Sequence, residues 1–136
     1  METLALKVRI AVLWIFLAVC FCSAGFILNF YEPGVIEEIM SGKMEGTPIT
    51  EGFLLFMYLF WLIPMIMAFL SIALKDSTNR LANMIVGILF VIFDIVHLIM
   101  HIAQGNLPLV HLVGIIFSIV APALIVWYAW KWPKQD

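Results

Sequence analysis

Four long apolar stretches constrain the fold of this chain more than any other feature. They cover, approximately, residues 10–30, 53–74, 81–102 and 109–130. A helix of about 20 residues is long enough to cross the roughly 30 Å of hydrocarbon in a bilayer. Hydrophobic residues make up 65% of the chain and charged residues only 12%, too few to cover a water-soluble globule. The chain is therefore predicted to be an all-α integral membrane protein, an antiparallel four-helix transmembrane bundle in one domain over residues 1–136.

The basic residues flanking the four spans predict how the chain crosses the membrane. Lys43 alone falls on one side if the spans alternate in direction. The other side carries six: Lys7, Arg9, Lys75, Arg80, Lys131 and Lys134. Because lysine and arginine concentrate on the cytoplasmic side, both termini are predicted to be cytoplasmic in a multi-pass protein of the cell membrane. The net charge of −2 offers no basic surface for nucleic acid, so the expected partner is the lipid bilayer, and a homo-oligomer stays open.

The only long connection, residues 31–52, is predicted to be extracytoplasmic. Residues 33–40 have the pattern of a short amphipathic helix, with a proline and two acidic residues near its start and Gly42 to end it. The loop glutamates Glu32, Glu37, Glu38 and Glu45 are interpreted as a solvated face, and Glu51 as an acid at the start of the second span.

Several stretches of the chain resemble a known family. They are AVLWIF (11–16), EPGVIEEIM (32–40), ITEGFLL (49–55), IPM (63–65), NRLAN (79–83) and IVWYAW (125–130). With these stretches the chain resembles an uncharacterised family of small four-helix membrane proteins from bacteria and archaea, known only as a domain of unknown function. The resemblance implies the four-span fold and says nothing about chemistry. In layout alone, the chain is also similar to DoxX-like four-helix proteins.

The third span carries the most informative polar pattern, Asp94-x-x-His97-x-x-x-His101. Since successive helical residues rotate by about 100°, these three side chains lie within about 60° of one another on one face. A carboxylate near the bilayer centre costs roughly 3 kcal/mol, so Asp94 must be protonated, paired or bound to a ligand. The two histidines have the spacing that lets one helix hold a divalent metal ion. A haem with two axial histidines would instead need one of them together with His111.

Other polar residues fall near the outer surface if the spans alternate in direction. They are Asn29, Glu51 and His111, and Tyr58 lies on the same side of the second span as Glu51. We therefore predict an outward-open polar pocket. The candidate ligand-binding residues are Asp94, His97, His101, Asn29, Tyr58 and Glu51, and the candidate metal ligands are His97, His101 and His111.

Three functions are compatible with this pocket. The first is binding or conduction of a small ligand, a proton or a divalent metal. The second is a small membrane enzyme that uses Asp94 and a histidine as acid and base on a lipid-like substrate. The third is an accessory or structural subunit without a site, in which Asp94 and the histidines are bonded within the bundle. The sequence leaves open the ligand, the choice between transport and catalysis, and the oligomeric state.

Overall fold

Four long helices dominate the structure. The computed structural model describes residues 2–105 and 107–133, without the side chains of residues 2, 28 and 29. All four helices are long and apolar enough to cross a membrane. They are α1 (Glu2–Tyr31), α3 (Glu51–Ala73), α4 (Asp76–Gln104) and α5 (Leu109–Trp130). The four predicted spans are thus present as helices.

Helices α1 and α4 begin earlier than the apolar stretches that predicted them. The reason lies in polar contacts between their first turns. The Lys7 Nζ atom donates a hydrogen bond of 2.9 Å to the Leu74 carbonyl and lies 2.8 Å from the Asp76 carboxylate. These contacts hold the polar turns of α1 and α4 together, so both helices continue beyond their apolar segments.

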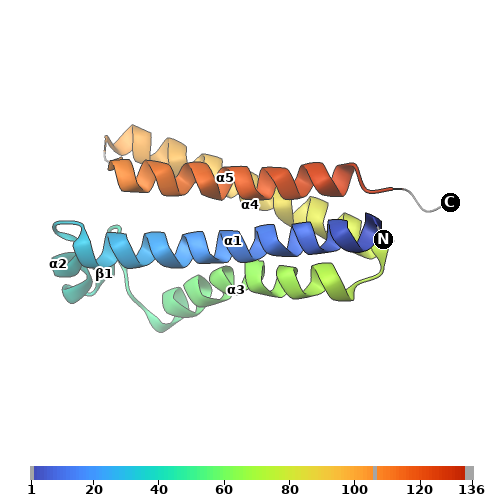
Figure 1. The fold of residues 1–136 in the computed structure, drawn as a ribbon. Coiled ribbons are helices and arrows are strands. Elements are labelled where there is room, and N and C mark those ends of the chain that lie inside the picture. Colours follow the sequence, from blue (N-terminus) through green and yellow to red (C-terminus); the bar gives the residue numbers. More distant parts are fainter. Residues whose placement is uncertain (1, 106, 134–136) are drawn as a thin grey trace.

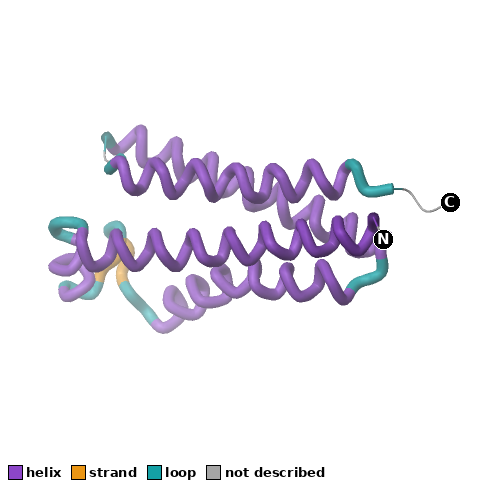
Figure 2. The backbone as a smooth tube through the Cα atoms, viewed as in Figure 1, coloured by secondary structure: helices purple, strands orange, loops and turns teal. Residues whose placement is uncertain are grey.

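The connection between α1 and α3 contains three short elements. The predicted short helix is present as α2 (Val35–Met40) and is followed by Gly42 with a φ of 81°. A hairpin of β1 (Lys43–Met44) and β2 (Thr47–Pro48) comes next and was not predicted. These elements lie at the end of the molecule opposite the start of α1, with the strands drawn in orange in Figure 2.

Helix α1 lies between α3 and α5, and α5 lies against α4 (Figure 1). The two short links, residues 75–80 and 103–108, predict that the second and third spans and the third and fourth spans are antiparallel neighbours. Of these pairs, α4 and α5 pack together along their lengths. The backbones of α3 and α4 approach each other less. Away from their link, the Phe60 ring of α3 bridges to α4, with ring centroids 5.2 Å from Phe90 and 4.6 Å from Phe93.

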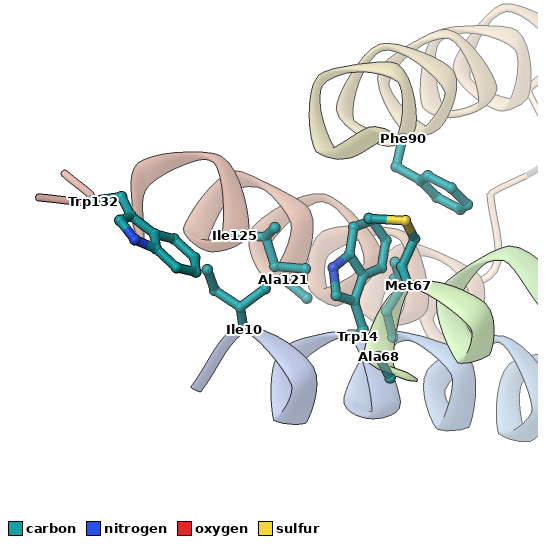
Figure 3. Packing of buried hydrophobic residues seen from close by; sticks show 9 residues of the cluster. Ile10, Trp14, Met67, Ala68, Phe90, Ala121, Ile125 and Trp132 are labelled. Atoms are coloured by element: carbon teal, nitrogen blue, oxygen red, sulfur yellow. The ribbon is translucent and has the colours of Figure 1, made fainter. Parts of the chain in front are cut away.

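The apolar core surrounds Trp14 of α1, which is fully buried (Figure 3). The Phe90 ring meets it edge-on, with centroids 5.6 Å apart. Figure 3 also shows core side chains from α3, from α5 and from the segment after α5: Met67, Ala68, Ala121, Ile125 and Trp132. Side chains from every long helix therefore meet around one indole.

Gly87 sets the distance between α4 and α5. A Cβ atom at this position would lie 2.8 Å from Val126 Cγ2, 3.4 Å from the Pro122 carbonyl oxygen and 3.6 Å from Ile125 Cγ2. Contacts near 2.8 Å are too short for a real Cβ atom, so a larger residue would force the helices apart. The absence of a side chain at Gly87 thus permits the close packing that fixes the register of the two helices.

Candidate functional site

Three histidines from two helices meet at the end of the molecule where α4 joins α5. The candidate metal-binding nitrogens of His97, His101 and His111 all lie within 4.8 Å of one another. The ring centroids are 4.6 Å apart for His97 and His101, 5.4 Å for His97 and His111, and 4.1 Å for His101 and His111. The predicted metal ligands are therefore close enough to share one ion.

The turn between α4 and α5 brings these histidines together. Helix α4 ends at Gly105, whose left-handed φ of 65° lets its N–H bond back to the carbonyls of the last turn. The chain then reverses, and Pro108 precedes the first turn of α5. His101 and His111 stand at equivalent distances from this reversal, which places them side by side in the antiparallel pair.

The same register repeats in steps of seven residues along the α4–α5 seam. Moving inward from the histidine pair, the next position on α4 is Asp94, which lies against Ser118 of α5. The following step is Gly87, which packs on α5 at Ile125 and Val126. Seven helical residues rise roughly 10 Å, so the seam carries an imidazole layer, a carboxyl layer and a closely packed layer in succession.

Asp94 is buried in this seam without full hydrogen bonding. Its side chain is 1% exposed, and its Oδ2 atom has no hydrogen-bond partner among the described residues. The neighbouring Ser118 hydroxyl donates its own proton to the Ile115 carbonyl at 2.9 Å. A buried carboxyl oxygen without a partner carries a desolvation cost, and such groups in membrane proteins commonly mark a site.

His97 contacts both another histidine of the cluster and an aromatic ring outside it. Its Nε2 atom lies 2.9 Å from the Nε2 atom of His101, a hydrogen-bond distance between two rings. On its other side the Phe93 ring lies 6.2 Å away between centroids.

Two other predicted site residues, Tyr58 and Glu51, are exposed. Tyr58 is 62% exposed, and Glu51 is exposed in the first turn of α3. The side chain of Asn29 lies outside the described part of the chain. A hollow of about 180 Å³ opens near this end, lined by Ile27, Tyr31, Glu32, Pro108 and Val110. The ligand-binding roles predicted for Asn29, Tyr58 and Glu51 stay predictions.

Comparison with known proteins identifies the family. The model of a "Family of unknown function (DUF6326)" matches residues 5–136. The chain belongs to this family. The match confirms the resemblance to an uncharacterised family. No curated protein and no solved structure matches the chain.

A second group of buried polar side chains in this family member lies near the opposite end. Asn83 of α4 accepts hydrogen bonds at its Oδ1 atom from the Trp14 indole at 2.6 Å and from the Ser71 hydroxyl at 3.1 Å. Its Nδ2 atom donates to the Asn79 carbonyl at 2.9 Å and to Asn79 Oδ1 at 2.6 Å. Asn79 Nδ2 in turn donates to the Ser71 carbonyl at 2.6 Å. Each of these side chains is fully buried.

This asparagine network joins three helices: α1 through Trp14, α3 through Ser71, and α4 through both asparagines. Sequence reasoning had not proposed it. The available signal was the pair Asn79 and Asn83, one helical turn apart near the start of the long apolar helix α4. Because its polar groups bond to one another, we assign the network a structural role.

Proposed function

We propose that this protein binds a divalent metal ion of the zinc class at His97, His101 and His111 in the cell membrane. In this proposal the four apolar helices form an antiparallel transmembrane bundle with both termini in the cytoplasm. The distribution of lysine and arginine supports that orientation. The histidine cluster then lies near the outer surface, where a cation can reach it from outside.

The proximity of the three imidazoles is the observation that carries this proposal. Zinc accepts histidine nitrogens at about 2.0–2.1 Å, so nitrogens sharing a tetrahedral ion lie about 3.3 Å apart. The candidate nitrogens already lie within 4.8 Å of one another, and the Nε2 atoms of His97 and His101 are 2.9 Å apart. Small rotations of the rings would bring all three to bonding distance. Bound metal would replace the hydrogen bond between His97 and His101.

Asp94 gives the site a second, deeper group. It lies two helical turns, roughly 10 Å, inward of His101 along the α4–α5 seam. Its buried Oδ2 atom lacks a partner among the described residues and is suited to accept a proton or a cation that passes the histidines. Further inward, the close packing at Gly87 closes the seam. We propose that the path entered from outside ends at Asp94.

Metal binding by the purified protein tests this proposal. The protein in detergent, stripped with a chelator, is titrated with Zn²⁺ and Co²⁺. We expect one ion per chain and the intense visible absorption of Co²⁺ held in low-symmetry nitrogen coordination. His97→Ala, His101→Ala and His111→Ala should each weaken binding by at least about tenfold, as expected for loss of a ligand.

Gln104→Ala is the matched control, because Gln104 is an exposed residue at the same end of α4. This variant should bind metal as the unaltered protein does. If the three histidine variants kept the full metal content and the cobalt absorption, the proposed site would be wrong.

A further inference from the structure

We propose that Asp94 is a proton-binding site, whose carboxyl group holds a proton in the folded protein and takes no part in binding the metal ion. The inference rests on the proposed function for the place of α4 in the membrane, and it names the ligand of the deeper group. A carboxylate inside the membrane is costly unless a proton, a cationic side chain or a metal ion neutralises its charge. The surroundings of Asp94 distinguish these three possibilities.

Few hydrogen-bond donors surround the Asp94 carboxyl group. Its side chain is 1% exposed, and its Oδ2 atom has no partner among the described residues. The Ser118 hydroxyl of α5 lies against the carboxyl group and bonds to the Ile115 carbonyl at 2.9 Å. An ionised carboxylate has two oxygens that together accept about four hydrogen bonds. A negative charge on Asp94 would therefore be left largely unsatisfied by the described residues.

The basic side chains in the described part of the chain are engaged elsewhere or exposed. The Lys7 Nζ atom lies 2.8 Å from the Asp76 carboxylate, and the Arg80 Nε atom donates to the Ala129 carbonyl at 3.2 Å. The other described lysines and arginines are exposed: Arg9, Lys43, Lys75 and Lys131. Asp94 therefore has no ion-pair partner among the described lysines and arginines.

A metal ion would find too few ligands at Asp94. Three described histidines form a group of candidate ligands within 4.8 Å, and Asp94 does not belong to this group. The nearest ionisable residue along α4 is His97, whose Nε2 atom lies 2.9 Å from the Nε2 atom of His101. On the inner side, the seam is closely packed at Gly87. Because Zn²⁺ usually takes four ligands, one carboxyl group beside one hydroxyl group is not a zinc site.

A proton neutralises the Asp94 carboxyl group without any further ligand. The neutral acid avoids the cost of a buried charge, and it suits a position beside the Ser118 hydroxyl, which can both donate and accept. The α4–α5 seam would then hold two different ligands at two depths. The metal ion would lie at the histidines, and the proton would lie at Asp94, roughly 10 Å further inward than His101.

Infrared spectroscopy of the purified full-length protein, in detergent near neutral pH and without metal, tests this inference. Exposed carboxyl groups are ionised under these conditions. We expect the unaltered protein to show the C=O stretching band of a protonated carboxyl group, which moves to lower frequency after exchange into D₂O. Asp94→Asn should lose this band. His111→Ala should keep it, because the proton at Asp94 does not depend on the metal site.

Two further variants and a metal titration complete the test. Asp94→Glu keeps a carboxyl group and should shift the band rather than remove it. Glu37→Gln, at an exposed glutamate of α2, is the matched control and should leave the band unchanged. Asp94→Asn should bind Zn²⁺ within about twofold of the unaltered protein, because a neutral amide replaces a neutral acid, whereas loss of a ligand would weaken binding about tenfold or more.

The outcomes distinguish this inference from the proposed function. If the unaltered protein and Asp94→Asn give the same carboxyl spectrum, the proton site is wrong and the histidine site stands. A loss of Zn²⁺ affinity of about tenfold or more in Asp94→Asn would make Asp94 a metal ligand and would also overturn the inference. If the unaltered protein binds no Zn²⁺, the proposed function is wrong, and the carboxyl band still decides whether Asp94 holds a proton.

Discussion

Buried polar side chains are hydrogen-bonded to one another toward one end of this molecule, whereas toward the other end a buried carboxyl oxygen has no partner among the described residues. In the proposed orientation, the end of the molecule where α1 begins is the inner end and the opposite end is the outer end. Near the inner end, the side chains of Asn79 and Asn83 donate and accept among themselves and with Trp14 and Ser71. Toward the other end, Asp94 has an oxygen without a partner among the described residues. The comparison separates polar groups that hold helices together from polar groups that are available to a ligand.

The two regions also differ in the elements that they join. The asparagine network connects α1, α3 and α4, and it lies beside the Trp14-centred core. The histidine cluster is built from side chains of α4 and α5. We therefore expect changes at the inner end to affect stability and changes at the outer end to affect metal binding.

Asn83→Leu should reduce the stability of the protein more than any other change proposed here. A small loss of stability would contradict the structural role of the asparagine network. This change removes four hydrogen bonds and leaves the Trp14 N–H buried without its acceptor. We expect the free energy of unfolding to fall by about 3 kcal/mol. Thermal unfolding in detergent measures this loss. The folded variant should still bind Zn²⁺, and a loss of metal affinity at low temperature would contradict the separation of the two regions.

Zn²⁺ should stabilise the folded protein by binding to the histidine cluster at the outer end. An ion present at 100 times its dissociation constant stabilises the folded state by about 2.7 kcal/mol if it binds only that state. We expect a rise in the midpoint of thermal unfolding that disappears in His111→Ala and persists in Asn83→Leu. Mg²⁺ serves as the control ion because it prefers oxygen ligands. An equal rise with Mg²⁺ would indicate a general ionic effect.

Gly87→Val tests the boundary between the two regions. The added side chain would collide with Val126 and the Pro122 carbonyl, so we expect a destabilisation of about 2 kcal/mol. The displaced α5 should also weaken Zn²⁺ binding, because His111 depends on the register of the seam. Gly52→Val at the exposed start of α3 is the control, and it should affect stability much less. Unchanged unfolding of Gly87→Val would contradict the close packing.

Asp94→Asn should give the smallest change in stability. Because the Oδ2 atom has no partner among the described residues, replacing it removes no hydrogen bond, and we expect a shift of less than about 1 kcal/mol. The matched exchange at the inner end is Asn83→Asp, which loses the donor to Asn79 and should destabilise more. A larger loss for Asp94→Asn, measured by thermal unfolding, would assign Asp94 a structural role.

The four spans could be predicted because an apolar stretch of about 20 residues with few charges is typical of a membrane-spanning helix and of few other structures. The start of α1 could not, since it depends on Lys7 meeting Asp76 across a long sequence separation. The β1–β2 hairpin was missed because its strands have two residues each, too few for an alternating pattern. Its signal was the pair Glu45-Gly46 in a loop rich in glycine.

The candidate site was predicted in part. The spacing of His97 and His101 follows from helical geometry, and the short turn to α5 brought in His111. The exposure of Tyr58 could not be predicted from the sequence, because it depends on which face of α3 packs against α1.

The place of α1 between α3 and α5 has a consequence for biosynthesis. Helix α1 is synthesised before α5, which covers one of its two packed faces, including the side chain of Ile10 (Figure 3). Until residues 109–130 enter the membrane, that face must be covered by lipid or by an insertion chaperone. A chain stopped after α4 would lack both His111 and the surface that completes α1, so truncated products would be recognisable to quality-control proteases.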